Sequence, residues 1–256
     1  MRVALVSDIH GNTVALDAVI ADMEQRRSEV VVCLGDIAAG GPDPNGAVDR
    51  VAERGWVAVQ GNTDVGMVDV PAWWRDPSAI GLPATAIPGL EVSVWSAEQL
   101  ATDQRRYLAD LPAAALVDLG GPGEMLAFHG SPRSADDFVT ATTPAVDLDE
   151  MFAGAGSSML AGGHTHVPLV RRHGVQTIVN PGSVGMPFAD YGYAGGVEVL
   201  RHAAYAIVTV NGGEVNIELR QVSVDPTALE ASVATSGMPH AEWWFGLRRR
   251  TRDGGD

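Results

Sequence analysis

Several polar residues of metal-ligand type stand directly after apolar runs of this sequence, most of them beside a glycine. The apolar runs end in SDIHGN, LGDIAAGG, QGNTD, AFHGSP and AGGHTH. The ligand candidates are Asp8, His10, Asp36, Asn62, His129, His164 and His166. Imidazole nitrogens, carboxylates and an amide oxygen suit Mn, Fe, Zn, Ni or Co, and the set contains no thiolate. The residue types therefore indicate a metal centre.

Each of these short motifs alone has an ordinary structural explanation. Gly-Asp and Gly-Asn are common turn dipeptides, and a lone histidine such as His129 is more often an interior residue with satisfied hydrogen bonds. The ordered set is more specific, because it contains four of the 7 histidines of the chain. The other three, His173, His202 and His240, fall in expected turns or near the C-terminus, where we expect them to be exposed. This distribution favours a metal site.

The number of candidate ligands indicates two metal ions. Seven ligands exceed what one tetrahedral ion requires, so we expect two divalent ions with one carboxylate shared between them. Two metals can generate a hydroxide nucleophile at neutral pH and can bind the oxygens of a phosphoryl group during in-line displacement. Manganese is the metal we expect, and Fe, Ni, Zn and Co fit the same ligands.

Residues 2–60 are expected to fold in a β-α-β-α-β order. Strands are predicted at 2–7, 29–34 and 56–60, and helices at 12–26 and 44–55. Helical crossovers make such strands parallel, so their carboxyl ends share one edge of the sheet. Ligands of open α/β sheets bind at that edge. The polar motifs that follow these strands are therefore expected to meet.

The rest of the chain is predicted to form helices followed by hairpins. We expect a helix or a pair of helices over 96–112, with Ser96 and Thr102 as N-caps. Hairpins are predicted at 114–129 and 168–180, and three strands at 197–222 with an Asn-Gly-Gly turn between the last two. A short helix is expected over 225–237, because a proline stands at its start and a glycine at its end.

One mixed α/β domain is predicted over residues 1–237, followed by a C-terminal tail at 238–256. The tail contains an arginine cluster that we expect to be solvated, formed by Arg248, Arg249, Arg250 and Arg252. It also contains the aromatic segment HAEWWFGL at 240–247. An apolar patch of this kind is expected to be buried, either against its own domain or at the interface of a homodimer.

Composition narrows the class of function. The chain has 256 residues and a formal net charge of −15, so strong nonspecific binding to nucleic acid or to an anionic membrane is not expected. All 17 basic residues are arginine, which excludes a catalytic lysine. The single cysteine, Cys33, follows an apolar run and is expected in the core. Because the sequence shows neither a signal-peptide pattern nor a membrane-spanning apolar stretch, we expect a cytoplasmic protein.

The ordered motifs resemble those of the calcineurin-like metallophosphoesterase superfamily. SDIHGN, GDIAAGGPDP, HGSPR and NPGSVGMP are similar to its small bacterial and archaeal phosphodiesterase branch, and the resemblance runs from residue 3 to about residue 220. It implies a four-layer αββα sandwich of two mixed β-sheets, with the metals at the edge of the sheets. It implies a first metal held by Asp8, His10, Asp36 and His166. It implies a second metal held by Asp36, Asn62, His129 and His164, so that Asp36 bridges the two.

The resemblance also implies a reaction. It implies hydrolysis of a phosphoric ester, most directly a small phosphodiester, with metal-bound hydroxide as the nucleophile and Asp36 and Asn62 in the catalytic centre. The superfamily usually has a histidine, taken to protonate the leaving group, where this chain has Thr63. A threonine hydroxyl is a poor general acid at neutral pH. We therefore expect weaker action on alkyl esters than on activated aryl diesters.

Two other functions are compatible with the same motifs. One is a phosphomonoesterase for phosphoproteins or nucleotides, and the other is a non-catalytic metal-binding scaffold, which would explain Thr63 but has no need of the ligands. Substrate contacts are predicted for Asn12 and Arg133, with a helix cap and a surface position as the respective alternatives. Asp64 is expected either to orient the site or to cap a turn. Residues 180–187 are expected to border the pocket.

Overall fold

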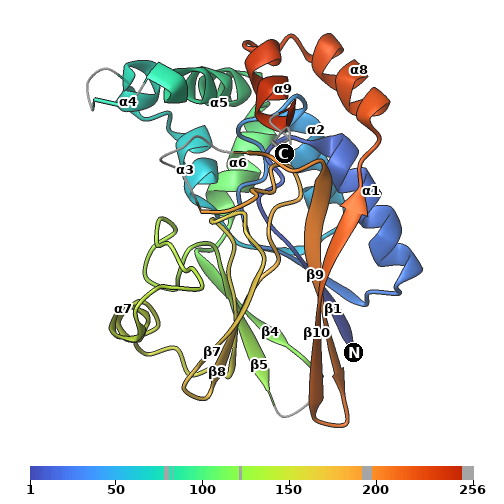
Figure 1. Cartoon of the computed structure of the whole chain (residues 1–256), viewed down its shortest axis with the longest axis vertical. Helices are drawn as coiled ribbons and strands as arrows, with labels where there is room; N and C mark the ends of the chain where they lie inside the picture. Colours follow the sequence, from blue (N-terminus) through green and yellow to red (C-terminus); the bar gives the residue numbers. More distant parts are fainter. Residues whose placement is uncertain (78–80, 83, 121–122, 192–197, 250–256) are drawn as a thin grey trace, which may run out of the picture.

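Two five-stranded mixed β-sheets pack face to face, and helices cover their outer sides (Figure 1). The computed structural model describes residues 1–77, 81–82, 84–120, 123–191 and 198–249. The first sheet has the strand order β10-β9-β1-β2-β3, and the second has the order β4-β5-β6-β8-β7. The expected α/β sandwich of two mixed sheets is confirmed.

The first part of the chain follows the predicted β-α-β-α-β order. β1 (Arg2–Val6), β2 (Val30–Cys33) and β3 (Val57–Ala58) are parallel neighbours, and α1 (Thr13–Gln25) and α2 (Pro44–Glu53) connect them. Asp8 follows β1 and Asp36 follows β2. The two carboxylates therefore leave the same edge of the first sheet.

β9 (His202–Asn211) and β10 (Glu214–Ser223) complete the first sheet as an antiparallel hairpin beside β1. The Asn-Gly-Gly turn joins them as predicted, but the first of the three expected strands is wrong for residues 198–200, the part of it that the structure describes. Val199 forms an isolated bridge with Phe188, and its N–H donates to the Leu247 carbonyl of α9 (Ala241–Arg249).

The second sheet contains both predicted hairpins. β4 (Ala114–Asp118) pairs with β5 (Glu124–Phe128), and β7 (Leu169–His173) pairs with β8 (Gln176–Asn180). β6 (Met159–Ala161), the short apolar run before His164, lies between β5 and β8 and is parallel to both. The ends of β5 and β6 thus bring His129 and His164 to the same edge of this sheet.

The side chains of β1 alternate between two hydrophobic cores, as the period of two requires. Val3 and Leu5 pack between the two sheets, whereas Ala4 and Val6 pack against the layer of helices. A third core lies on the outer face of the second sheet, where Leu148 of α7 (Ala145–Met151) is buried. Hydrophobic cores therefore lie on both faces of the first sheet and on the outer face of the second sheet.

Residues 62–110 contain helices α3 (Asn62–Val68), α4 (Ala72–Arg75), α5 (Ile87–Gln99) and α6 (Thr102–Asp110). α6 and the end of α5 occupy the segment predicted as helical at 96–112, but α5 already begins at Ile87 and the two predicted N-caps are wrong. Ser96 lies inside α5, where its hydroxyl donates to the Val92 carbonyl at 2.8 Å. Thr102 is the first residue of α6, and Ala101 holds the N-cap position.

The C-terminal part forms two helices. α8 (Pro226–Ser236) is the predicted short helix, capped by Asp225 and ended by Gly237. α9 (Ala241–Arg249) packs back onto α5 and α8 (Figure 1). None of the helices in the described segments is long and apolar enough to cross a membrane.

The predictions for the aromatic segment and for the arginine cluster of the tail had different outcomes. Trp244 is fully buried against its own domain, as one of the two predicted alternatives required. Arg248 is also buried, so the expectation of a solvated arginine is wrong at this position. Its guanidinium stacks 3.3 Å from the centre of the Trp244 ring. Arg250 and Arg252 lie outside the described residues, and the boundary at 237 stays a prediction.

Candidate metal centre

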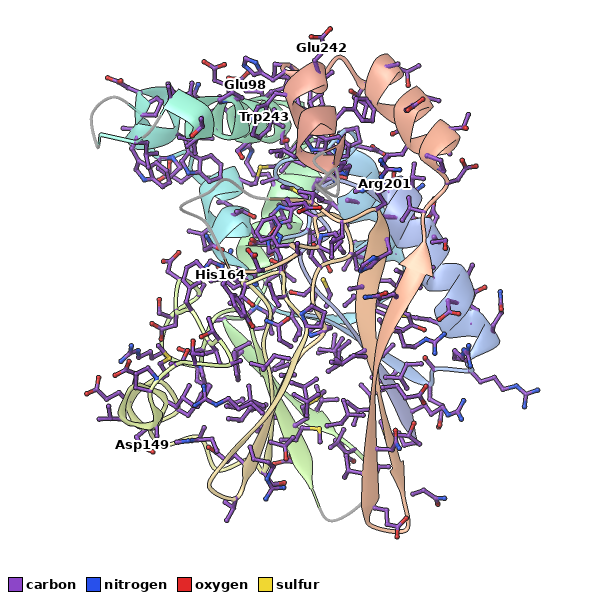
Figure 2. All side chains as sticks on the ribbon, in the orientation of Figure 1. Glu98, Asp149, His164, Arg201, Glu242 and Trp243 are labelled. Carbon is purple, nitrogen blue, oxygen red and sulfur yellow. The ribbon has the colours of Figure 1, made fainter. Side chains whose placement is uncertain are left out.

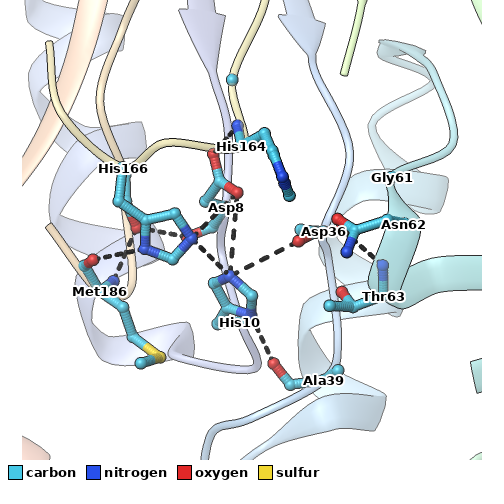
Figure 3. A network of polar contacts seen from close by, with 12 residues as sticks. Asp8, His10, Asp36, Ala39, Gly61, Asn62, Thr63, His164, His166 and Met186 are labelled. Carbon is cyan, nitrogen blue, oxygen red and sulfur yellow. Dashed lines mark hydrogen bonds and ion pairs between the residues drawn. The ribbon is translucent and has the colours of Figure 1, made fainter. Parts of the chain in front are cut away.

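The predicted ligands lie close together in the structure. Figure 2 places His164 where the strands end and the helices begin, and Figure 3 shows it with Asp8, His10, Asp36, Asn62 and His166. Asp8, His10 and His166 form one group, and Asp36, His129 and His164 form another. Within each group, one ligand atom from each residue lies within 4.8 Å of the others. These two groups of three agree with the grouping that the family resemblance implies, and the role of the residues as metal ligands stays a prediction.

Asp36 lies between the two groups. Its Oδ2 is 3.4 Å from Nε2 of His129 in its own group and 3.7 Å from Nε2 of His10 in the other. The Asn62 amide joins the second group, because its Oδ1 lies 3.0 Å from Nε2 of His129. The two groups therefore form one continuous cluster of donor atoms.

Backbone carbonyls orient three of the four histidines. Nδ1 contacts a carbonyl oxygen at 2.6 Å from Ala39 for His10, at 2.6 Å from Leu34 for His129 and at 2.7 Å from Met186 for His166. An Nδ1–H that donates to a carbonyl leaves the Nε2 lone pair free to bind a metal. The Nε2 atoms of His10 and His166 face each other at 3.1 Å. A shared cation would relieve the repulsion between two such lone pairs.

Two buried ligand atoms, Asp8 Oδ1 and His164 Nε2, make no hydrogen bond among the described residues, and Asp8 Oδ1 lies 3.2 Å from Nε2 of His166. A polar atom without a partner is costly to bury, so these two atoms call for a ligand that the protein does not itself supply. A divalent cation accepts lone pairs from both kinds of atom. Imidazole, carboxylate and amide donors together fit Mn, Fe, Zn, Ni or Co.

Five of the candidate ligands have a left-handed backbone. The φ angles are 54° for Asp8, 49° for His10, 55° for Asp36, 67° for His164 and 60° for His166. This conformation is uncommon outside glycine, and non-glycine residues that adopt it cluster at functional sites. Hydrogen bonds between the loops after β1 and β2 hold it, such as Asp8 N–H to the Gly35 carbonyl and His10 N–H to the Asp36 carbonyl, both at 3.0 Å.

The glycines of the motifs allow a close approach of the chain to the ligands. A Cβ at Gly163 would lie 1.9 Å from Ser7 Oγ and 2.8 Å from Asp8 Oδ2. A Cβ at Gly35, where φ is +92°, would lie 2.5 Å from the Gly61 nitrogen. Neither position has space for a side chain, which explains why glycine precedes His164 and Asp36 in their motifs.

Neighbouring histidines keep the two carboxylates ionised. Burial alone would raise the pKa of Asp8, but His166 and His129 lower it to about 2. Burial alone would raise the pKa of Asp36, but His129, His10 and His164 together hold it well below its usual range. Both side chains are therefore carboxylates, the form that binds metals, at neutral pH.

The surroundings shift the pKa of the histidines in two different directions. Burial lowers the pKa of His10 and of His164, which favours the neutral ring that binds metals. At His129 burial acts in the same direction, but the Asp36 and Asp8 carboxylates and the Leu34 carbonyl together outweigh it and raise the pKa to about 10. The negative field that favours a proton on His129 also favours a cation at that position.

Asp64 supports the second group without belonging to it. Its Oδ2 accepts hydrogen bonds from the N–H groups of Gly61 at 2.9 Å and Asp36 at 2.8 Å, and its Oδ1 accepts from Ile37 N–H at 2.9 Å. Burial and the Asp36 carboxylate raise the pKa of Asp64 to about 7, whereas the N–H donors act against this. Asp64 thus combines the two roles considered from sequence, since it caps α3 and fixes the turn at Asp36.

Thr63 lies beside the candidate metal ligands, and its side chain is a poor general acid. Its N–H donates to Asp36 Oδ1 at 2.9 Å (Figure 3). Its hydroxyl is buried and has no hydrogen-bond partner among the described residues.

The two predicted substrate contacts are engaged elsewhere in the protein. Asn12 is buried; its Oδ1 caps α1 by accepting from Ala15 N–H, and its Nδ2 donates to the Gly185 carbonyl. Arg133 is half-exposed and pairs with Asp137, with Nε 2.7 Å from Oδ2. Their contacts to substrate stay predictions.

Two phenylalanines contact the histidines of GHTH. The Phe138 ring lies edge-on to His164 with centroids 4.5 Å apart, and the Phe188 ring stacks on His166 at 4.2 Å. Phe188 opens the aromatic segment that directly follows NPGSVGMP, for which packing is the role that the sequence favours. Sequence reasoning missed Phe138, which stands in a loop without any pattern that predicts the contact.

The remaining histidines are outside the centre. His173 pairs with Asp149 at 2.9 Å, and His240 contacts Glu91. His240 is exposed as expected, whereas His173 and His202 are partly buried.

Comparison with known proteins gives the family. Residues 1–221 match the calcineurin-like phosphoesterase superfamily domain. A metallophosphoesterase structure from Sphaerobacter thermophilus is 26% identical over 96% of this chain and 98% of that chain, with a TM-score of 0.70. A hypothetical protein from Pyrococcus horikoshii has the same fold at 20% identity, with 96% and 97% coverage and a TM-score of 0.77. An uncharacterized protein of Methanocaldococcus jannaschii is 24% identical over 96% of both chains. The chain belongs to the calcineurin-like phosphoesterase superfamily.

Proposed function

We propose that this protein is a dinuclear metal-dependent phosphodiesterase. The observation that carries the proposal is the position of Asp36, whose Oδ2 lies 3.4 Å from His129 Nε2 and 3.7 Å from His10 Nε2. A carboxylate between two groups of metal-ligating atoms fits the role of a bridging ligand. Membership of a phosphoesterase family supports hydrolysis of a phosphoric ester.

The ligand groups define which residues would hold each ion. Asp8, His10, Asp36 and His166 would hold the first, and Asp36, Asn62, His129 and His164 the second, with manganese favoured and Fe, Ni, Zn or Co compatible. Two such ions supply Lewis acidity toward phosphoryl oxygens and a hydroxide nucleophile at neutral pH. The protein contributes imidazole rings held in fixed orientations and the buried carboxylates of Asp8 and Asp36.

The residue at position 63 favours diesters with activated leaving groups. Thr63 is a poor general acid, so substrates whose leaving groups need no protonation are favoured. A monoester carries more negative charge than a diester at neutral pH. Arg133, the arginine predicted to contact substrate, is paired with Asp137 and does not offer a free basic group for that extra charge.

The proposal is tested by comparing bis-p-nitrophenyl phosphate with p-nitrophenyl phosphate, using protein stripped by a chelator and refilled with Mn²⁺, Ni²⁺ or Zn²⁺. We expect metal-dependent cleavage of the diester, faster than the monoester by about tenfold or more, which corresponds to about 1.4 kcal/mol in activation free energy. Asp36→Asn should abolish it. Asp110→Asn, at an exposed position of α6, is the matched control.

Two other outcomes would redirect the assignment. Faster cleavage of the monoester would identify a phosphomonoesterase. Binding of two ions without turnover of either ester would identify a metal-binding scaffold.

A further inference from the structure

Helix α9 donates hydrogen bonds to two loops whose backbone carbonyls orient candidate metal ligands. The indole Nε1 of Trp244 donates to the Gly40 carbonyl at 2.8 Å, and Nη2 of Arg248 donates to the Gly185 carbonyl at 2.7 Å. Both side chains are buried. α9 lies beyond residues 1–221, which match the family domain.

The first of these bonds lies one residue from the carbonyl that orients His10. Ala39 accepts from Nδ1 of His10 at 2.6 Å, and the next residue, Gly40, is held by Trp244. Gly40 is fixed from its other side as well, because its N–H donates to the Ser96 hydroxyl of α5 at 3.3 Å. A shift of α9 would therefore move the peptide that sets the ring of His10.

The second bond holds the loop that orients the other two ligands of the same group. The Gly185 N–H donates to the Asp8 carbonyl at 3.0 Å. The carbonyl of the next residue, Met186, contacts Nδ1 of His166 at 2.7 Å. Arg248 thus fixes a residue that bonds to Asp8 directly and to His166 through its neighbour.

The second ligand group is oriented from elsewhere. The Leu34 carbonyl sets His129 at 2.6 Å, and the Asp64 carboxylate sets the backbone of Asp36 at 2.8 Å. Within the described part of the chain, neither Leu34 nor Asp64 receives a hydrogen bond from α9. The contacts of the helix are therefore selective for one group.

We propose that α9 is a positioning element for the first metal, with Trp244 and Arg248 as its positioning residues. Loosening the helix then weakens metal binding at Asp8, His10 and His166 and leaves the second group unaffected. The inference rests on the proposed function only in requiring that the first group binds a divalent ion. Because binding linkage is reciprocal, the first metal in turn stabilises the docked helix.

The test measures Mn²⁺ affinity by titration calorimetry in two backgrounds, each retaining one group. His164→Ala retains the first group, and His10→Ala retains the second. Trp244→Phe, which keeps a ring but removes the N–H, should weaken Mn²⁺ binding about tenfold in the first background, the lower end of the effect of groups that orient ligands. It should leave the affinity in the second background unchanged.

Matched controls separate positioning from general loosening. Trp243→Phe changes the neighbouring indole, which packs near Gly89 of α5 and makes no hydrogen bond among the described residues. Arg248→Met should act like Trp244→Phe. Arg171→Met, which removes two guanidinium bonds to the carbonyls of Thr140 and Thr143, should leave the affinity of the first group unchanged.

A second measurement reports on the helix itself. Hydrogen exchange of the α9 amides should slow when Mn²⁺ is added to the His164→Ala protein, and stay the same when it is added to the His10→Ala protein. Equal loss of affinity in both backgrounds would overturn the inference, as would no loss in either, and both results leave the dinuclear proposal standing. Failure of the unaltered protein to bind Mn²⁺ would overturn both.

Discussion

The carboxylate of Asp64 holds the backbone of Asp36, with Oδ2 accepting from the Asp36 N–H at 2.8 Å. The backbone of Asp36 is left-handed, with φ of 55°, a conformation that needs support from its surroundings. The same side chain accepts from Gly61 and Ile37, so that one buried carboxyl group caps α3 and fixes the turn that carries Asp36, the proposed bridging ligand. Asp64, the fourth residue of the GNTD motif, thus affects the candidate metal centre through the backbone of Asp36.

Asp64→Asn should lower both stability and metal affinity. The amide has the same shape, but its NH₂ group must face one of the backbone N–H donors, which leaves a buried donor unsatisfied. We expect a loss of about 2 kcal/mol in the free energy of unfolding of the metal-free protein, together with weaker Mn²⁺ binding. Asp69→Asn, at the exposed C-cap of the same helix, should change neither. Unchanged denaturant midpoints for Asp64→Asn would contradict this account.

Gly163→Ala should disable the first ligand group. The added methyl would lie 1.9 Å from Ser7 Oγ and 2.8 Å from Asp8 Oδ2, so the chain or the ligand must move. We expect a cost of about 1–3 kcal/mol, as for other overpacked sites, and loss of Mn²⁺ at the first group in calorimetry. Gly156→Ala is the control, because a Cβ there meets nothing within 4 Å. Two tightly bound ions in Gly163→Ala would show that the close approach is unnecessary.

Sequence was sufficient to predict that the candidate ligands cluster, because they stand in loops that follow short apolar strands. The β-α-β order puts Asp8 and Asp36 at one sheet edge whatever the details of packing, and the glycines mark where the chain turns. The residue types of the candidate ligands can also be read directly from the sequence. The clustering of the candidate residues could therefore be predicted without knowledge of the tertiary contacts.

Tertiary contacts decided the features that sequence missed. The SAEQ pattern at Ser96 is typical of a helix start, yet α5 already begins at Ile87, so Ser96 is interior. Trp243 and Trp244 are adjacent and chemically alike, and only packing against residues 204 positions away makes Trp244 the one that bonds to Gly40. No local pattern encodes such a contact.

Thr63→His should widen the range of leaving groups. Thr63 donates its N–H to Asp36 Oδ1, so a side chain at this position lies at the metal centre. An imidazolium there can protonate an alkoxide, which a threonine hydroxyl does poorly. The ratio of alkyl to aryl diester turnover should rise by about 10²-fold, the lower end of the effect of general acids. An unchanged ratio, with metal content unchanged, would refute a role for Thr63 in leaving-group selectivity.

Asp22 should make stability depend on pH far from the metal centre. Its Oδ2 accepts from the Tyr205 hydroxyl at 2.5 Å and from Arg220 Nε at 2.8 Å, which ties α1 to the β9–β10 hairpin. Burial alone would raise the pKa of Asp22, but Arg220 and Tyr205 lower it. Because the folded pKa lies below the unfolded value of about 3.9, the contribution is present above that pH and is lost as pH falls through the folded pKa.

The variant Asp22→Asn should therefore be less stable than the unaltered protein by about 1 kcal/mol at pH 7, and the difference should shrink below about pH 4. Urea unfolding in the presence of a chelator measures this without a contribution from bound metal. Asp17→Asn is the control on the same helix, because Asp17 is half-exposed and its ion pair with Arg50 should contribute less than about 0.5 kcal/mol. A difference for Asp22→Asn that is constant from pH 7 to pH 3 would show that the removed interaction does not depend on the ionised carboxylate.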